Sequence, residues 1–272
     1  MSSKPTAVGK LSGSIHKFAF IDSHCHLDFN ELADDLATHI KAAHSNGVER
    51  FVVPGVTLKQ SLELIEFQAH HPQCEIAAGL HPYFIGEHRD DDMTALVEHV
   101  IHNRTQLCAI GECGIDTTCD ALERQIALFE AHIALSNQVK LPLIVHHRKS
   151  HHLIAAAFKR VKPRYGGVIH AFSGSKQQAE YYIGQGFKLG VGGTITYPRG
   201  EKTAQVISQL PLESLVLETD APSMPLHGYQ GKPNSPKRVV QVFDRLCEYR
   251  SETPSELVSA LYRNTTQLFG LS

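Results

Sequence analysis

The stretch FAFIDSHCHLD, residues 18–28, joins an apolar run to a pair of histidines. Its first four residues are typical of a short buried strand. His24 and His26 are two positions apart, and extended backbone points such side chains the same way. Two imidazoles at one strand end can bind a single metal ion, and we expect Asp22 and Asp28 to orient the rings. H-x-H is common, and the chain has 18 histidines. The pair alone therefore does not establish a metal site, and further ligands must come from the rest of the sequence.

Outward from this stretch, short apolar runs alternate with longer segments that have helical spacing. The predicted strands are Phe18–Ile21, Arg50–Val53, Glu75–Gly79, Leu107–Ile110, Leu143–Val145, Gly167–Ile169, Phe187–Val191 and Leu215–Leu217. The predicted helices are Glu31–Ser45, Leu58–His70, Met93–Asn103, Asp120–Gln138, His151–Arg160, Lys176–Gln185, Lys202–Gln209, Pro236–Tyr249 and Pro254–Phe269. Strands that alternate with helices favour parallel pairing, and eight such units predict an α/β fold, a closed (β/α)8 TIM barrel. The alternative is a doubly wound open sheet, which would usually carry a glycine-rich loop where this chain has His-Cys-His.

Length and composition set further bounds on the protein. The chain has 272 residues, of which 42% are hydrophobic and 20% charged, and this suits one barrel domain over residues 18–272. Residues 1–17 are expected to be a loose lead-in without the apolar core of a signal peptide. The formal net charge of −2 excludes strong non-specific attraction to long nucleic acid.

The cysteines and the apolar runs bear on the compartment. Six scattered cysteines without a C-x-x-C motif indicate reduced thiols and a cytoplasmic protein. No apolar run approaches the roughly 18 residues that would cross a bilayer, so we expect no membrane association. Nothing in the sequence indicates an obligatory protein partner, and we expect a monomer.

Polar residues gather where the predicted strands end. Six of the eight strands are followed by histidines or carboxylates: His24 and His26, His81, Glu112 and Asp116, His146 and His147 with Arg148, His170, and Glu218 with Asp220. The carboxyl ends of barrel strands meet on one face, which is where such barrels hold their active sites. We therefore expect these side chains to form one site.

Their chemistry favours a pair of divalent metal ions. The expected ligands are four histidines and two carboxylates: His24, His26, His146, His170, Glu112 and Asp220. Glu112 is expected to bridge the ions, with the first histidine pair and Asp220 on one ion and the second pair on the other. Mixed nitrogen and oxygen ligands suit Zn, Mn, Fe, Co or Ni, and Mg less well. Two ions roughly 3.5–4 Å apart can activate a water, and Asp220 is the expected base for its proton.

Other interpretations stay open at each position. Glu112 and Asp220 could form an ion pair at a strand end, and His146 and His170 could be core histidines with satisfied hydrogen bonds. Alternation along the strand points His147 away from the site, so it is left out. The pairs at 70–71 and 151–152 are expected at the surface, and Cys25 and Cys113 are expected to be neighbours of the ligands. A structural zinc site would favour more cysteines.

Together these residues resemble the TatD family of metal-dependent deoxyribonucleases, among the amidohydrolase-like barrels. The motifs that carry the resemblance are Asp22–Asp28, Gly79-Leu-His81-Pro82, Gly111-Glu112-Cys-Gly-Ile-Asp116, Val145-His146, Gly167–Gly174, Glu218-Thr-Asp220-Ala-Pro222 and Asn264–Phe269, and they span nearly the whole chain from residue 18 to 269. The segment from Asp220 to Pro236 looks most like the bacterial YjjV branch. The resemblance implies the same six metal ligands, a His81 that faces the scissile phosphate, and an Asp220 essential to hydrolysis.

Two departures from the family pattern concern the substrate pocket. His147 stands where relatives commonly have Ser, Cys or Thr, and the run from Gly190 to Arg199 replaces a segment in which relatives often carry a lysine. Arg148 is a candidate for binding phosphate, because its guanidinium matches phosphate geometry. The backbone N–H groups of Gly190–Thr194 are a second candidate.

The main hypothesis is a divalent-metal-dependent deoxyribonuclease that cleaves DNA ends, short strands or another small phosphodiester through a metal-activated water. A metal-dependent amidase, lactonase or deaminase of a small molecule is the alternative, since the same activated water can attack a carbonyl. A binding protein without catalysis is a third hypothesis, against which the complete ligand set argues.

Overall fold

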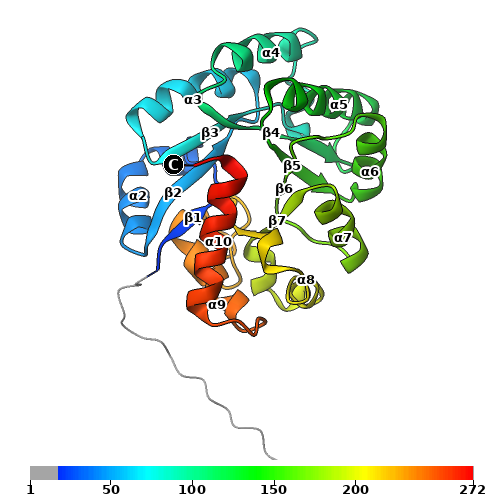
Figure 1. Cartoon of the computed structure of the whole chain (residues 1–272). Helices are drawn as coiled ribbons and strands as arrows, with labels where there is room; N and C mark the ends of the chain where they lie inside the picture. The colour runs from blue at the N-terminus through cyan, green and yellow to red at the C-terminus, as the bar shows by residue number, and fades with distance from the viewer. Residues whose placement is uncertain (1–17, 272) are drawn as a thin grey trace, which may run out of the picture.

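The computed structural model describes residues 18–271, which form one eight-stranded sheet with the strands in chain order, each parallel to the next (Figure 1). The first and last strands are joined as well. The N–H of Ser23 donates to the carbonyl of Leu217 at 2.9 Å, and Cys25 and Ala221 form a parallel bridge. The predicted (β/α)8 barrel is confirmed, and the open doubly wound sheet is excluded. The expected lead-in, residues 1–17, lies outside the described residues.

The elements have the following bounds. The strands are β1 (Phe20–Asp22), β2 (Val48–Pro54), β3 (Cys74–Ala78), β4 (Leu107–Asp116), β5 (Leu143–Arg148), β6 (Gly167–Ile169), β7 (Phe187–Val191) and β8 (Leu215–Leu217). The α-helices are α1 (Asn30–Ala33), α2 (Leu36–His44), α3 (Leu58–His70), α4 (Asp92–His102), α5 (Leu122–Val139), α6 (His151–Arg160), α7 (Lys176–Gly184), α8 (Glu201–Ile207), α9 (Val239–Cys247) and α10 (Pro254–Phe269). Short 3-10 turns are η1 (Pro82–Phe84), η2 (Gly193–Thr196), η3 (Pro198–Gly200), η4 (Leu212–Ser214) and η5 (Pro236–Arg238).

Two strands continue well past the C-terminal ends that the sequence predicts. β4 continues past Ile110 to Asp116, and β5 continues through the two histidines to Arg148. The β4–β5 pairing is irregular between Ile110 and Cys113 and then resumes. Gly114 permits this close pairing, because its φ is +148° and a Cβ there would lie 2.1 Å from the carbonyl oxygen of His146. The extended pair brings residues expected in loops onto rigid strands.

The expected helix Glu31–Ser45 is two helices in the structure. α1 ends at Ala33, and Asp35 has a non-helical backbone conformation before α2 begins. Aspartate is a poor helix former in a helix interior, because its side chain competes for backbone hydrogen bonds. The turn shortens the helix that follows the two site histidines.

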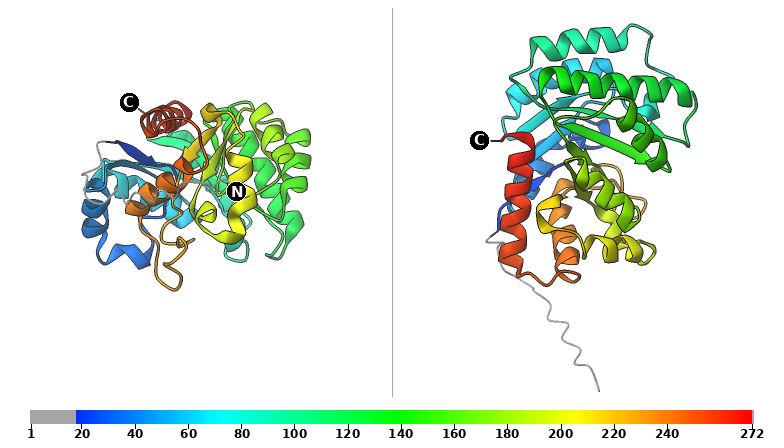
Figure 2. Two further views of the ribbon diagram at one scale, coloured as in Figure 1. Left: turned by 90° about the horizontal axis from the view of Figure 1, so that it is seen from below. Right: turned by 45° about the vertical axis from the view of Figure 1, so that its right-hand side comes forward.

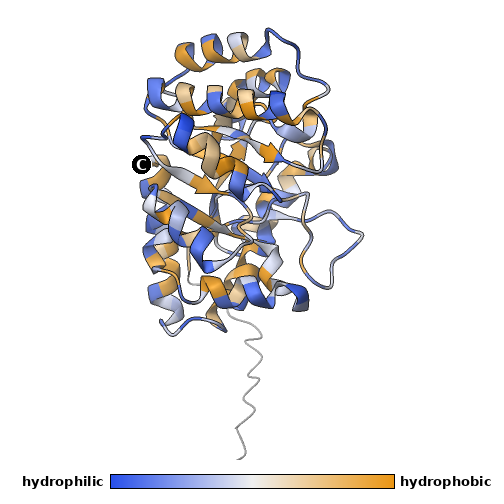
Figure 3. Cartoon of the chain, turned by 90° about the vertical axis from the view of Figure 1, so that its right-hand side faces the viewer, coloured by the Kyte–Doolittle hydropathy of each residue, from blue (hydrophilic) through white to orange (hydrophobic). Residues whose placement is uncertain are grey.

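The core has two parts. Inside the barrel, small and branched side chains of the strands pack with the end of α10: Ile21, Val52, Ala77, Ala109, Ile144, Val168, Val216 and Phe269 belong to this cluster. A larger cluster fills the layer between the strands and the helices. In α9, five buried residues recur at helical spacing, and Phe243 meets Phe20 edge to face at 5.1 Å. Figure 3 shows hydrophobic residues along the strands and hydrophilic ones on many outer segments.

The C-terminal helix closes the ring. Thr253 and Glu256 form a reciprocal capping box at the start of α10, and Gly270 ends the helix in a left-handed conformation. α10 contacts both β8 and β1 and lies at one edge of the molecule in the right-hand view of Figure 2. It therefore spans the junction that brings the first and last strands, and the site residues that follow them, together. None of the described helices has both the length and the apolar character that crossing a bilayer requires.

Candidate metal centre

A cavity of about 720 Å³ lies at the carboxyl ends of the strands. Six of the sequence-predicted site residues border it: His26, His81, Glu112, His146, His170 and Asp220. His24 lies beneath them and is fully buried. Arg148 borders the same cavity from the end of β5. The structure thus brings together the six expected metal ligands, His81 and Arg148.

Four atoms form the first group. They are the Nε2 atoms of His24 and His26, Oε2 of Glu112 and Oδ1 of Asp220. The two nitrogens are 3.3 Å apart. His24 lies 3.1 Å from Glu112 and 3.5 Å from Asp220, and His26 lies 3.6 and 3.5 Å from the same oxygens. Ligands about 2.0–2.2 Å from a tetrahedral ion are about 3.3–3.6 Å from one another. The donor set and its spacing therefore fit one divalent metal ion.

The second group surrounds the other oxygen of Glu112. Its Oε1 lies 3.2 Å from Nε2 of His81, 3.2 Å from Nδ1 of His146 and 4.0 Å from Nε2 of His170. Nε2 of His170 is also 3.7 Å from Oδ1 of Asp220. This group is wider than the first. One buried carboxylate thus faces two sets of imidazole nitrogens, one set with each oxygen, and such an arrangement suits a pair of ions.

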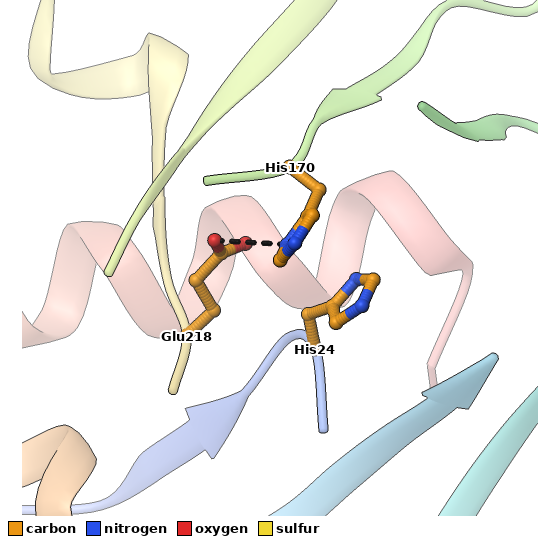
Figure 4. Close-up of side chains that lie close together, drawn as sticks. All are labelled: His24, His170 and Glu218. Atoms are coloured by element: carbon orange, nitrogen blue, oxygen red, sulfur yellow. Dashed lines mark ion pairs between the residues drawn. The ribbon is translucent and has the colours of Figure 1, made fainter. Parts of the chain in front are cut away.

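The sequence places Glu218 near the site, at the end of β8, but indicates no role for it. Its Oε1 lies 3.0 Å from Nδ1 of His170 and accepts the N–H of Ala171 at 2.6 Å. Figure 4 shows this carboxylate pointing at the His170 ring, with the ring of His24 close by. The two rings stack with centroids 3.6 Å apart. A carboxylate at Nδ1 leaves the Nε2 lone pair free to face the cavity. The available signal was its position directly after β8, on the face of the barrel where the strand ends meet.

The neighbouring histidines shift the pKa values of the two carboxylates in this cluster. Burial alone would raise the pKa of Glu112, but His81, His24 and His170 hold that pKa well below its usual range. In the same way, burial opposes ionisation of Asp220, and His170 and His26 nevertheless keep its pKa low. Both carboxylates are therefore anionic at neutral pH. Two buried anions among neutral or protonated imidazoles form a site whose charge suits divalent cations.

The ring of His81 has a defined hydrogen-bonding state. Its Nδ1 accepts the N–H of Tyr83 at 3.0 Å, and burial lowers its pKa to about 4. A neutral ring that accepts at Nδ1 carries its proton on Nε2. Nε2 therefore donates a hydrogen bond toward the cavity, where it now lies near Glu112. This state suits contact with a substrate oxygen better than ligation of a metal.

Asp22 and Asp28 do not orient the imidazoles, and this expectation is wrong. Asp22 accepts the N–H and the hydroxyl of Thr219 at 2.9 and 2.5 Å, and Asp28 accepts from Gln60. The Nδ1 atoms of His24 and His26 have no hydrogen-bond partner among the described residues. Asp22 instead ties β1 to the segment after β8. The side-chain rotamer of Asp22 determines which groups it contacts, and the sequence does not predict that rotamer.

Gly190, in β7, and Gly192, just after it, have a steric role. A Cβ at Gly190 would lie 2.1 Å from Oε2 of Glu218, and one at Gly192 would lie 3.3 Å from Oε1. The Glu218 carboxylate thus occupies the space over these two residues. Thr194 borders the cavity further along this loop.

The surroundings of His147, His151 and the cysteines bear on three further expectations. The ring of His147 packs against that of His151, with centroids 4.4 Å apart, and His147 borders the cavity together with His146. His151 is not simply a surface residue, since it is half-buried and contacts the hydroxyl of Tyr182 and the carbonyl of Ser173, each at 2.9 Å. The cysteines are all free, and the two beside the site are fully buried with their sulfurs near backbone carbonyls of other strands.

A (β/α)8 barrel with this histidine and carboxylate set at the ends of its strands defines a metal-dependent hydrolase. The chain belongs to the family of TatD related DNases, whose model matches residues 21–270. It is 41% identical to the uncharacterized metal-dependent hydrolase YjjV of Escherichia coli K12, over 93% of this chain and 98% of that protein.

Two further comparisons agree with this assignment. The chain is 27% identical to the 3'-5' ssDNA/RNA exonuclease TatD of Citrobacter rodentium, over 92% of this chain and 98% of that protein. The crystal structure of the E. coli YjjV protein, a TatD homolog, superimposes with a TM-score of 0.88 and covers 93% of this chain and 98% of that one. The resemblance that the motifs indicated, including its YjjV branch, is confirmed.

Proposed function

We propose that this protein hydrolyses phosphodiester bonds at the ends of single-stranded DNA or RNA, using two divalent metal ions. One observation carries the proposal: the two oxygens of buried Glu112 face two separate sets of imidazoles. The relative named as a 3'-5' ssDNA/RNA exonuclease supports the choice of substrate. We propose His24, His26, Glu112 and Asp220 as ligands of one ion, and His146, His170 and Glu112 as ligands of the other.

When bound, the ions would polarise the phosphoryl group and acidify a water; Zn, Mn, Co and Ni suit these ligands, and Mg less so. The residues of the chain supply the remaining parts. Asp220, whose side chain is still 13% exposed to the cavity, takes the proton of the attacking water. Nε2–H of His81 donates to a phosphoryl oxygen, and Arg148 binds a neighbouring phosphate. The water oxygen forms a bond to phosphorus, the ester P–O bond breaks, and the leaving oxygen receives the proton from Asp220.

The test is metal-dependent release of nucleotides from a single-stranded oligonucleotide. Asp220→Asn keeps the size of the side chain but removes the base and weakens a ligand, so the rate should fall by about 10³-fold or more. Asp34→Asn, at an exposed position between α1 and α2, is the matched control and should retain the wild-type rate. If wild-type protein loaded with Mg, Mn, Co, Ni or Zn releases no nucleotide, the proposal is rejected. Turnover of an amide or lactone panel would then favour the small-molecule alternative.

We also propose that residues 18–272 act as one domain, as a monomer in the cytoplasm. The free cysteines support a reducing compartment. Sedimentation analysis of the purified protein tests the monomer.

A further inference from the structure

An exposed aromatic side chain stands at the mouth of the metal-site cavity. Tyr83 is 68% exposed, and no other large hydrophobic side chain of the described residues is as exposed. Tyr83 also borders the cavity. Phe84 borders the cavity too, and its ring meets that of Tyr83 edge to face at 5.3 Å. Leaving a ring in water forgoes the free energy of its burial. A pair of rings beside a candidate active site is therefore a candidate surface for a flat ligand.

The backbone joins this aromatic pair to the proposed catalytic machinery. The N–H of Tyr83 is the group that donates to Nδ1 of His81, and η1 begins at Pro82, directly after that histidine. The ring of Phe84 lies 6.2 Å from the His81 ring. A ligand stacked on Tyr83 would therefore lie within one turn of chain from the histidine that we propose as a donor to the scissile phosphate. That separation suits adjacent parts of a single nucleotide.

The remaining wall of the cavity supplies a different chemistry. Arg148, Ser173 and Thr194 border it from the ends of β5 and β6 and from η2. Among the described residues, no carboxylate forms an ion pair with Arg148. A cavity of about 720 Å³ falls within the range of small-ligand sites, about 300–1,000 Å³. Aromatic rings and a cation around one such cavity match a base and its phosphates.

We propose that Tyr83, supported by Phe84, stacks the base of the nucleotide next to the scissile phosphate. This inference rests on the proposed function and deepens it, because it makes an unpaired base a determinant of the substrate. Base-on-aromatic stacking is sequence-tolerant, since every base has a π face. The subsite therefore favours single-stranded ends over paired ones without selecting among the four bases.

The experiment crosses protein variants with substrates. One single-stranded oligonucleotide carries a normal base at the cleaved end and its partner carries an abasic sugar there, with the phosphates unchanged. The wild type should show a KM about 10-fold or more lower for the base-bearing strand. Tyr83→Ala should lose this preference, with KM rising much more than kcat falls, because stacking binds substrate and transition state alike. Tyr83→Phe keeps the ring and should keep the preference.

Controls separate stacking from other causes. Tyr165→Ala removes another exposed tyrosine, 41% exposed and just before β6 at the opposite end of the strands, and should keep the wild-type preference. A Tyr83→Ala variant that still prefers the base-bearing strand would overturn the inference. So would concentration-dependent self-association that Tyr83→Ala abolishes, because the ring would then contact a second copy.

Failure of the proposed function gives a different result. In that case the wild type cleaves neither strand with any of the metals tested. Fluorescence anisotropy then measures binding of the same strands, carrying a label, to the Zn-loaded Asp220→Asn protein. This measurement tests stacking independently of cleavage. Equal binding of the base-bearing and abasic strands would overturn it, and a preference for the base that Tyr83→Ala removes would support it.

Discussion

His132 shows how one buried imidazole holds the chain beside the site. Its Nε2 accepts the N–H of Leu80 at 3.1 Å, and its Nδ1 lies 2.7 Å from the carbonyl of Leu128. The ring is therefore neutral, with its proton on Nδ1. It is fully buried, and burial lowers its pKa to about 4. Because Leu80 precedes His81, this hydrogen bond fixes the start of the segment that carries the proposed phosphate donor.

The pKa of His132 gives a prediction of stability against pH. The unfolded chain takes up this proton near pH 6.5 and the folded protein only near pH 4. The unfolded state thus binds more protons in between, and the free energy of unfolding falls as pH drops from 6.5 towards 4. From pH 7.5 to pH 5, His132 alone should account for a loss of about 2 kcal/mol. Urea unfolding of the wild type and of His132→Gln measures it, and the variant should lose about 2 kcal/mol less over this interval. His152→Gln, an exposed histidine on α6, should follow the wild type; equal losses in all three proteins would contradict the assignment.

At the scale of residues, the sequence located the site but not all of its contacts. His24, Glu112, His170 and Asp220 could be placed together because barrel topology brings the ends of all strands to one face. The carboxylate that meets His170 is Glu218, whereas Asp22 turns towards Thr219. Side-chain rotation chooses among neighbouring carboxylates, and the spacing of residues along the chain does not record it.

At the scale of elements, one buried amide organises the long loop after β8. The side chain of Asn234 is fully buried. Its Nδ2 donates to the carbonyls of Thr219 and Met224 at 2.9 and 3.2 Å, and its Oδ1 accepts the N–H of Ser235 at 2.9 Å. Met224 borders the metal-site cavity. The amide therefore holds one edge of the cavity against the end of β8.

Asn234→Ala should loosen this loop. The substitution leaves buried carbonyl and N–H groups without partners, each at a cost of about 1–3 kcal/mol. We expect the free energy of unfolding to fall by about 2–4 kcal/mol and limited proteolysis to cut first within residues 222–235. Lys232→Ala changes an exposed side chain of the same loop and should alter neither measurement. Unchanged stability and cleavage in Asn234→Ala would show that the loop is held by other contacts.

Element order was predictable, and element length was less so. Every predicted strand is present, because each apolar run is short and bounded by a helix-like segment. β4 and β5 extend past their apolar runs into the polar residues of the site, since pairing between the two strands continues there. That pairing depends on contacts far apart in sequence, which a local pattern cannot reveal. The interruption before α2 likewise lies within one continuous helical pattern.

At the scale of the whole molecule, the candidate ligands tie distant parts of the barrel together. His24 follows β1, Glu112 and His146 lie in β4 and β5, His170 follows β6 and Asp220 follows β8. Strands β8 and β1 meet through few backbone hydrogen bonds, among them that from the N–H of Asp220 to the carbonyl of His24 at 2.8 Å. A cation held by both residues would strengthen this junction. The folded state binds metal through a geometry that the unfolded chain lacks, so binding adds to stability.

Removal of metal should therefore lower the melting temperature of the entire barrel. A free metal concentration about 100 times Kd adds about 2.7 kcal/mol, which for a chain of this size corresponds to a rise in Tm of roughly 5–10 °C. Scanning calorimetry of protein treated with a chelator, and then supplied with Zn, Mn, Co, Ni or Mg, measures the shift and ranks the metals. Asp220→Asn removes one anionic ligand of the tighter group and should reduce the shift by more than half, while Asp34→Asn should retain it. If chelated and metal-supplied wild-type protein melt at the same temperature, the cluster of imidazoles and carboxylates does not hold metal in the folded protein, and the hydrolytic mechanism built on it fails with it.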